Sequence, residues 1–281
     1  MRWTGWSRGL TISGLILVIL SMVWLLAIFP AMAKLPADLD KATDFEGTYT
    51  VMNSETQAMD EIPVNVERYQ LATDVQGNVL IIEETVTSTH ALAGVELAQF
   101  GSTSVLGVER STRVHVSGYG DMDRTGQFTF PAGAKKESYP FWISTAGRAP
   151  DAEFIGEQDF HGLRVFEFEI NAQDLDIGTQ AGTGLPQVLD ISTVIKVEPV
   201  SGVPVDTESY TVINIVPAPD MKVPVCISDL RFTDDTIADY VDYATSSRNM
   251  ILWATVYGFW AVVGLGGALI LAGGAIAIRT R

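Results

Sequence analysis

The chain has 281 residues, which in a soluble protein would form about two domains of ~150 residues each. Residues 9–29 and 250–278 argue against a soluble protein: neither contains Asp, Glu, Lys, Arg or His, and each exceeds the ~20 apolar residues that cross a bilayer core. All 34 acidic residues lie between these segments with 14 of the 18 basic ones, a net charge of −20. That balance argues against a nucleic-acid partner, because phosphate binding needs the opposite sign.

The two ends of the chain carry only basic charges. Arg2 and Arg8 precede the first apolar segment, and Arg279 and Arg281 follow the second. Since positive charges beside a span stay on the cytoplasmic side, we expect a multi-pass protein of the plasma (inner) membrane with both termini cytoplasmic. The predicted parts are cytoplasmic tails at 1–8 and 279–281, transmembrane helices at 9–29 and 250–278, a linker at 30–44, an extracytoplasmic β-rich domain at 45–232 and a juxtamembrane helix at 233–249.

A secretory signal peptide is the alternative interpretation of the N-terminus. Ala31-Met32-Ala33 fits an A-x-A cleavage site, but the apolar stretch at 9–29 is longer than the ~7 to 15 residues typical of signal peptides. An uncleaved helix is therefore favoured. Cleavage after Ala33 would leave the rest of the domain on the same side of the membrane.

The second apolar segment carries small residues at helical spacing, which let two helix backbones approach closely. The candidate packing residues are Gly264, Ala268, Ala272, Gly266, Gly274, Gly273 and Ala277. Their partner is either the first helix, which offers Gly9, Ser13, Gly14 and Ser21, or another subunit, and the sequence leaves both open. Neither span holds an ionisable group, which excludes an intramembrane proton relay, a pump or a secondary transporter.

Aromatic residues flank both spans, as in proteins whose Trp and Tyr side chains lie at the membrane–water interface. We expect Trp24, Trp253, Tyr257 and Trp260 at the outer interface, and Trp3 and Trp6 at the inner one. The lipid bilayer is thus the first partner that the sequence indicates.

Between residues 45 and 230 the chain is rich in Val, Ile, Thr, Tyr and Phe and is interrupted by Gly, Pro, Asp and Asn, a pattern typical of short strands. The expected strands are 47–52, 64–72, 79–88, 111–117, 126–130, 152–158, 163–171, 191–197, 208–216 and 225–232, with a short helix at 91–100 and glycine turns at 76–78, 160–162 and 200–202. The predicted fold class is a membrane-anchored, β-rich α+β protein. Two transmembrane helices flank one antiparallel, curved sheet that forms a sandwich or a partial barrel.

A helix is predicted directly after the last strand. Thr233 is a fair N-cap, and Asp234 and Asp235 suit the positive end of a helix dipole. No Gly or Pro interrupts residues 233–257, so one helix of ~45 residues is expected to run on through the second span. Pro30 and Pro36 are expected to end the first helix instead.

Residues that would indicate catalysis or metal binding are scarce. His90, His115 and His161 are the only histidines, and none has a Cys, His or carboxylate at metal-ligand spacing. Nucleotide-binding and hydrolase motifs are absent, and the single Cys226 is expected to be a buried, inert thiol. We therefore expect no enzyme activity, no catalytic residue, no metal and no cofactor.

Four stretches resemble the PorA-type family of actinobacterial and related cell-envelope proteins, much of which is a domain of unknown function. They are GQFTFPAGAKKESYPFWISTAGRAPDAEFIGEQDFHGLRVFEFEIN at 126–171, LGVERSTRV at 106–114, VEPVSGVPV at 197–205 and LRFTDDTIADYVDYA at 230–244. The resemblance covers most of the chain, including both spans, and implies a cell-envelope membrane protein. The family name implies a cell-wall channel, and no site residue follows from it.

The first functional hypothesis is a non-enzymatic two-pass membrane protein that acts as a structural, scaffolding or accessory subunit of a membrane or envelope assembly. It implies a protein partner or a homo-oligomer, through the second span or the exterior domain. The alternatives are binding or transfer of a lipid or hydrophobic ligand by the curved sheet, and a homo-oligomeric PorA-like channel. Ligand binding requires an apolar cavity of several hundred Å³. It loses its main support if six aromatic residues fill one solid core, namely Phe128, Phe130, Phe141, Trp142, Phe166 and Phe168.

Overall fold

The computed structural model describes residues 5–32, 34–53, 56, 58–219 and 221–279. The chain divides into two compact units, one formed by the segments 1–34 and 246–281 and the other by residues 35–245. We call the first the helix pair and the second the β domain. Trp3, Arg2, Arg281 and Ala33, which the sequence singled out, lie outside the described residues.

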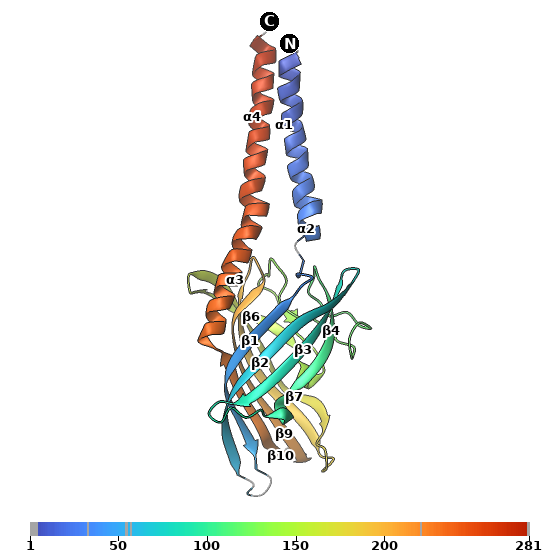
Figure 1. Ribbon diagram of the computed structural model, residues 1–281, viewed down its shortest axis with the longest axis vertical. Helices are drawn as coiled ribbons and strands as arrows, with labels where there is room; N and C mark the ends of the chain where they lie inside the picture. The colour runs from blue at the N-terminus through green and yellow to red at the C-terminus, as the bar shows by residue number, and fades with distance from the viewer. Residues whose placement is uncertain (1–4, 33, 54–55, 57, 220, 280–281) are drawn as a thin grey trace. The chain divides into compact units, whose positions relative to one another are not determined.

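The β domain is built on one antiparallel sheet that is strongly curved and twisted (Figure 1). Its ten strands lie in the order β4-β3-β2-β1-β10-β9-β8-β7-β6-β5 and the sheet is not closed. The strands are β1 Asp40–Met52, β2 Met59–Gln76, β3 Val79–His90, β4 Ser102–Glu109, β5 Tyr139–Pro140, β6 Asp151–Phe160, β7 Leu163–Thr179, β8 Pro186–Glu198, β9 Val203–Ala218 and β10 Met221–Phe232. This arrangement, with the two long apolar terminal helices, confirms the predicted fold class.

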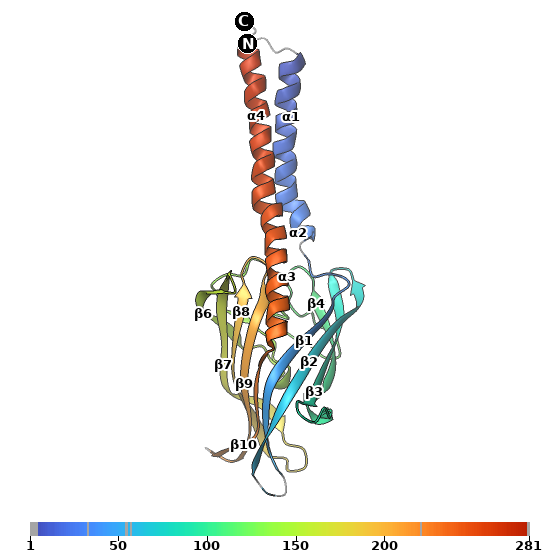
Figure 2. The same ribbon diagram turned by 60° about the vertical axis from the view of Figure 1, so that its left-hand side comes forward.

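The order of the strands follows from two meanders that meet at the centre of the sheet. The chain moves outwards from β1 to β4, crosses to the opposite edge, and returns strand by strand from β5 to β10, which pairs with β1 (Figure 2). Positive φ angles at Gly77, His161, Gly162 and Gly202 make the expected tight turns, because glycine adopts this conformation without a Cβ clash.

The expected strands at 111–117 and 126–130 are wrong. Both segments make only isolated bridges, in which Val108 pairs with His115, Val114 with Gln127, and Gln127 with Phe141. Three glycines and two aspartates between residues 118 and 126 turn the chain too tightly for a regular ladder to extend. These bridges instead link the edge strand β4 to the residue that follows β5, across the gap left by the open sheet.

The helix expected at 91–100 is also wrong, since only Ala98–Phe100 form a short 3₁₀ turn. Residues 91–97 are drawn into a turn in which the amide of His90 donates to the carbonyl of Val95. The edge strand β4 was not expected, because its Ser-Thr-Ser start lacks an apolar alternation. Strand β1 begins at Asp40, inside the segment that was expected to be a linker.

The first helix comprises α1 Gly5–Val23, a π-helical turn Trp24–Ile28 and α2 Phe29–Met32, so it continues past Pro30 instead of ending there. A proline ring in a helix clashes with the carbonyl four residues earlier. Here that residue is Leu26, which lies in the wider π-helical turn. The local widening accommodates Pro30.

The second helical segment runs without a break over the 46 residues Asp234–Arg279. It comprises α3 Asp234–Leu252, a π-helical turn Trp253–Tyr257 and α4 Gly258–Arg279. Its start is capped as predicted, since the Thr233 hydroxyl accepts a hydrogen bond from the Thr236 amide, and Asp234 and Asp235 occupy the first turn.

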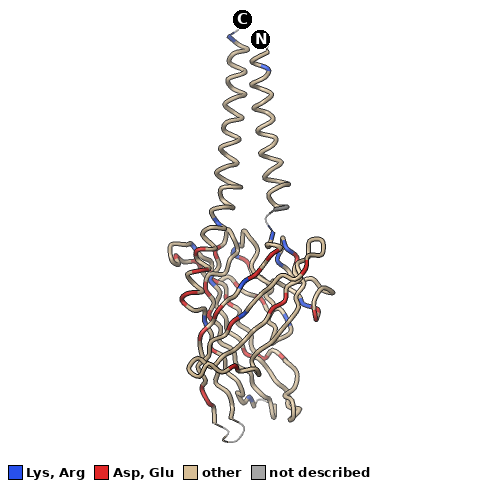
Figure 3. The backbone as a smooth tube through the Cα atoms, viewed as in Figure 1, with Lys and Arg blue, Asp and Glu red and all other residues tan. Residues whose placement is uncertain are grey.

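Within the helix pair, α1 packs closely on α4 through glycine. A Cβ atom at Gly14 would lie 2.4 Å from the carbonyl oxygen of Gly266, and one at Gly273 would lie 2.3 Å from the Thr11 hydroxyl. Gly266, Gly273 and Ala277 are buried, whereas Gly264, Ala268 and Ala272 are exposed and Gly274 is half-buried. The candidate packing residues therefore lie on two faces, one of which contacts the chain's own first helix. Lys, Arg, Asp and Glu gather on the β domain and are missing from the long middle part of the described helix pair (Figure 3).

The helix contact gives a direct prediction. Gly266→Leu places a side chain against the backbone of Gly14 and is expected to destabilise the helix pair by ~1–3 kcal/mol, the usual cost of overpacking. Gly264→Leu is the matched control, because a Cβ atom there meets nothing within 4 Å. Thermal unfolding of the detergent-solubilised chain measures both, and equal melting temperatures for the two variants would contradict the contact.

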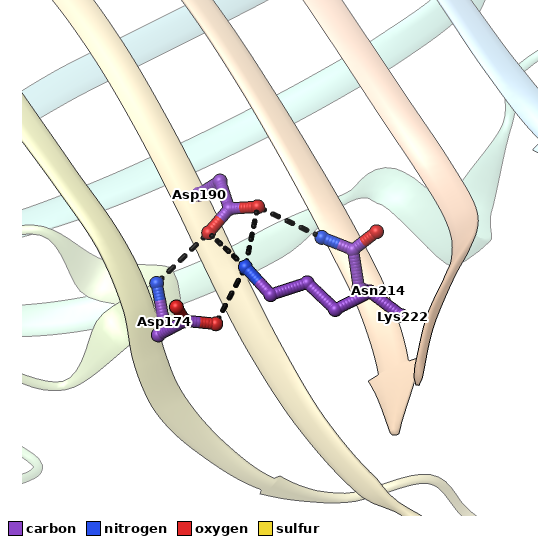
Figure 4. A network of polar contacts seen from close by, with 4 residues as sticks. All are labelled: Asp174, Asp190, Asn214 and Lys222. Carbon is purple, nitrogen blue, oxygen red and sulfur yellow. Dashed lines mark hydrogen bonds and ion pairs between the residues drawn. The ribbon is translucent and has the colours of Figure 1, made fainter. Parts of the chain in front are cut away.

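A polar network joins strands β7 to β10 at one end of the sheet (Figure 4). The carboxylate of Asp190 accepts hydrogen bonds from the Asp174 amide at 2.8 Å and from the Asn214 side chain at 3.1 Å. Lys222 forms ion pairs with both Asp174 and Asp190. The network lies beside register shifts at Ala172/Leu175 and Met221/Val223, so it holds together strands whose regular ladders are interrupted.

Asp190→Ala is expected to accelerate hydrogen exchange at the Asp174 amide and in the adjoining part of β7, because that amide loses its acceptor. Asp229→Ala, an exposed aspartate on β10, is the control and should leave this exchange unchanged. Hydrogen-exchange mass spectrometry of the full chain measures the difference. Unaltered exchange around residue 174 in the Asp190 variant would show that the network does not hold this end.

Candidate functional site

The β domain contains a partly open cavity of about 650 Å³. Its walls come from strands β1, β2, β7, β8, β9 and β10, from helix α3, and from the chain segment that crosses between β4 and β6. Residues 35–39 before β1 and residues 99–102 at the start of β4 complete them. A cavity of this size lies within the ~300–1,000 Å³ range of small-ligand sites. It meets the volume requirement set by the ligand-binding hypothesis.

The cavity exists because every second residue of each strand faces it. On β9 the facing residues are Thr207, Ser209, Thr211 and Ile213, and on β10 they are Cys226, Ser228, Leu230 and Phe232. Several of these side chains are short and leave space that Phe or Leu would fill. Aromatic and aliphatic side chains line the remaining wall, among them Phe45, Phe128, Phe141, Trp142, Ile191 and Ile195.

The six aromatic residues singled out in the sequence do not form one solid core. Phe130, Phe166 and Phe168 are buried in a single hydrophobic cluster, with Phe141 packed at its margin. Phe128, Phe141 and Trp142 line the cavity. The sequence pattern alone did not separate the two groups, because Phe128 and Phe130 fall in the same predicted strand at 126–130, yet only Phe128 lines the cavity.

The charged residues that line the cavity are Lys41, Arg68 and Arg113, and no Asp or Glu is among its described lining residues. The sign of this charge is opposite to that of segment 30–249 as a whole, which contains 34 acidic and 14 basic residues. None of these three cations is singled out by a sequence motif. They are far apart along the chain. The one signal was the two-residue spacing that puts Arg68 on the same strand face as Val66, and Lys41 on the same face as Phe45.

Lys41 is held against the aromatic rings of α3. Its ammonium nitrogen lies 3.4 Å from the centre of the Tyr240 ring and 4.5 Å from that of Tyr243, a cation–π arrangement. Burial, together with the smaller effect of the Arg68 charge, lowers the pKa of Lys41 to about 8, and Asp239 partly opposes this shift. The lowered pKa records that the positive charge is incompletely solvated.

Arg113 and Arg68 lie in comparable surroundings. Arg113 has φ 63°, a left-handed conformation that is uncommon outside glycine, and its guanidinium donates to the carbonyl of Phe130 at 2.6 Å. Burial lowers the pKa of Arg113, while Tyr243 acts in the opposite direction. The Nε atom of Arg68 is buried and has no hydrogen-bond partner in the described part of the chain.

The cysteine and the histidines do not build a site. Cys226 is half-buried and lines the cavity, and burial raises the pKa of its thiol. The described residues contain no group of three or more His, Cys, Asp or Glu that would hold a metal ion. His90 and His161 lie at turns, and His115 is buried beside the rings of Phe128 and Trp142.

The aromatic residues expected at the membrane interface occupy different settings. Trp6, Trp253, Tyr257 and Trp260 are exposed on the helix pair. Trp24 instead donates its indole N–H to the Ala254 carbonyl at 2.9 Å, within the second π-helical turn. Trp24 therefore links the two helices as well as lying near the expected outer end of the first span.

A family model described as porin PorA matches residues 7–275, which is nearly the whole chain. The match includes the ten described strands and all but the outermost residues of the two helical segments. No curated protein matches the chain.

His115 gives a pH prediction for the β domain. Burial, with a smaller effect of Arg124, lowers the pKa of His115 from its ordinary 6.5 to about 4. The unfolded chain therefore binds a proton below pH 6.5 that the folded chain does not bind until about pH 4, so stability falls as the pH drops through this window. The loss attributable to His115 is expected to be up to ~3 kcal/mol.

His115→Asn should remove this part of the pH dependence, whereas His161→Asn, an exposed histidine, should keep it. Denaturant unfolding of the solubilised chain between pH 4 and 7 compares the two. Identical slopes of unfolding free energy against pH for both variants would contradict the assignment to His115.

Proposed function

Because the chain belongs to the PorA family, whose model matches residues 7–275, we propose that it is a two-pass protein of the cell envelope whose β domain binds a lipid or similar hydrophobic ligand. The cavity of about 650 Å³ with its largely aromatic and aliphatic wall carries this proposal. Closed antiparallel barrels of about eight strands are wide enough to hold one small ligand, and the curved ten-stranded sheet described here, although open, leaves a comparable interior. The sequence by itself favours the hypothesis of a structural or accessory subunit. The cavity inside the curved sheet is the observation that favours ligand binding instead.

The same proposal includes the topology of the chain. Two helices are long and apolar enough to cross a membrane, and basic residues flank both spans on one side. The positive-inside rule supports cytoplasmic termini and an extracytoplasmic β domain. A protein partner or a second copy of the chain at the second helix stays a prediction, for which the exposed Gly264, Ala268 and Ala272 offer a small-residue face.

A channel formed by several copies is the second candidate function, because the family is described as a porin. It differs from ligand binding in a measurable way. Reconstituted chain would conduct ions across a planar bilayer if it formed a channel, and a ligand-binding domain would not.

Blocking the cavity tests the ligand-binding proposal. Thr211→Trp fills the space beside Ser228, whereas Tyr210→Trp alters the neighbouring, exposed position of the same strand and is the matched control. Native mass spectrometry of full-length chain drawn gently from its own membranes should detect a lipid-sized adduct on the wild type and on Tyr210→Trp, and at least tenfold less on Thr211→Trp.

Two other outcomes would contradict the proposal. An adduct that persists on Thr211→Trp would lie outside the cavity. A wild-type chain that arrives without lipid and with foreign chains would instead support the accessory-subunit hypothesis.

A further inference from the structure

The charges of the cavity define the ligand more narrowly than its volume does. Lys41, Arg68 and Arg113 line it, and no carboxylate is among the described lining residues, although the segment around them carries a net charge of −20. Resting on the ligand-binding function above, we propose that the ligand is an anionic amphiphile whose carboxylate or phosphate headgroup is bound by Lys41, Arg68 and Arg113 while its apolar chain occupies the rest of the cavity.

The three cations act on one region of the cavity. Lys41 lies over the rings of Tyr240 and Tyr243, and Arg68 is close enough to lower the pKa of Lys41. Tyr243 in turn acts on Arg113, whose pKa it raises. Tyr243 therefore connects Lys41 and Arg113, and its hydroxyl is a further hydrogen-bond donor for a headgroup at this position.

None of the three cations has a carboxylate of its own. Within the described residues, no ion pair within 4.0 Å involves Lys41, Arg68 or Arg113. One carboxylate, Asp239, acts on Lys41, and it lies on the exposed side of α3. Partly buried cations without a counter-ion are costly, and an anionic headgroup would supply the missing charge.

The rest of the cavity suits an alkyl chain. Phe45, Phe128, Phe141 and Trp142 contribute ring faces, and Ile170, Ile191 and Ile195 contribute branched aliphatic surface. A free inorganic anion would leave this surface exposed to water. An amphiphile satisfies the cations and the apolar wall together, which is the reason for choosing it over a small anion.

Photoreactive probes of equal chain length test the proposal on the full chain in nanodiscs of zwitterionic lipid. The three probes are diazirine-bearing palmitate, hexadecyl phosphate and hexadecanol, which differ only in the headgroup. On the wild type, crosslinking to peptides that line the cavity should be at least tenfold stronger for an anionic probe than for hexadecanol. Palmitate and hexadecyl phosphate together distinguish a carboxylate from a phosphate headgroup.

Neutralising variants identify the binding residues. Lys41→Met and Arg68→Gln should each reduce crosslinking of the anionic probe about tenfold and leave hexadecanol crosslinking unchanged. Arg164→Gln, which removes an exposed arginine outside the cavity, should change neither. Lys41→Met keeps most of the side-chain length, so the packing against Tyr240 is preserved.

The outcomes distinguish the proposal of an anionic headgroup from the proposal that the cavity binds a hydrophobic ligand at all. Equal crosslinking of hexadecanol and both anionic probes at the cavity would overturn the anionic headgroup while leaving hydrophobic ligand binding in place. Equal loss of all probes in the Lys41 and Arg68 variants would also overturn it, since the cations would then serve the fold. Absence of crosslinking at cavity peptides for every probe would overturn the ligand-binding function itself.

Discussion

The pairing of β1 with β10 is the constraint on which the β domain depends. These strands lie at opposite ends of the domain's sequence, yet they are neighbours at the centre of the sheet, with Phe45 opposite Phe232 and their rings 5.0 Å apart. Gly47 makes the approach possible, because a Cβ atom there would lie 1.9 Å from the Asp229 carbonyl oxygen. Without this long-range pair the two meanders would be separate sheets, neither of which encloses a cavity.

One half of the curved sheet is solid and the other is hollow, and the difference is one of side-chain size. Phe166 and Phe168 on β7 fill their side of the interior together with Phe130 from the crossing segment. On β9 the cavity-facing residues are Thr207, which is in register with Phe168 through Ile195, and Ser209 and Thr211 beyond it. Their side chains are too short to reach across. Close packing is the rule in protein interiors, so the unfilled space between a wall of small polar residues and the aromatic rings is the feature on which the ligand proposal rests.

Whether a feature of the fold or of the cavity could be predicted from the sequence depends on whether local or long-range contacts determine it. The apolar spans, the Thr233 cap and the glycine turn at Gly202 follow from local patterns, and the sequence predicted them. The edge strand β4, the bridges made by His115 and Gln127, and the helix that continues past Pro30 depend on contacts or ladder irregularities that no local pattern records. The same holds for the cavity cations, because alternation along a strand indicates which residues share a face but not what lies opposite them.

The distribution of charge connects the fold to the proposed ligand. Lys41 and Arg113 lose solvation in the cavity, as their lowered pKa values record, and a buried charge that is left unpaired destabilises the fold. The acidic surface also repels a free anion, which lowers its concentration near the site. An amphiphile overcomes that repulsion, because each Å² of its buried alkyl chain contributes roughly 25 cal/mol. Cations that line a cavity within an acidic domain thus favour an anionic amphiphile over a small inorganic anion.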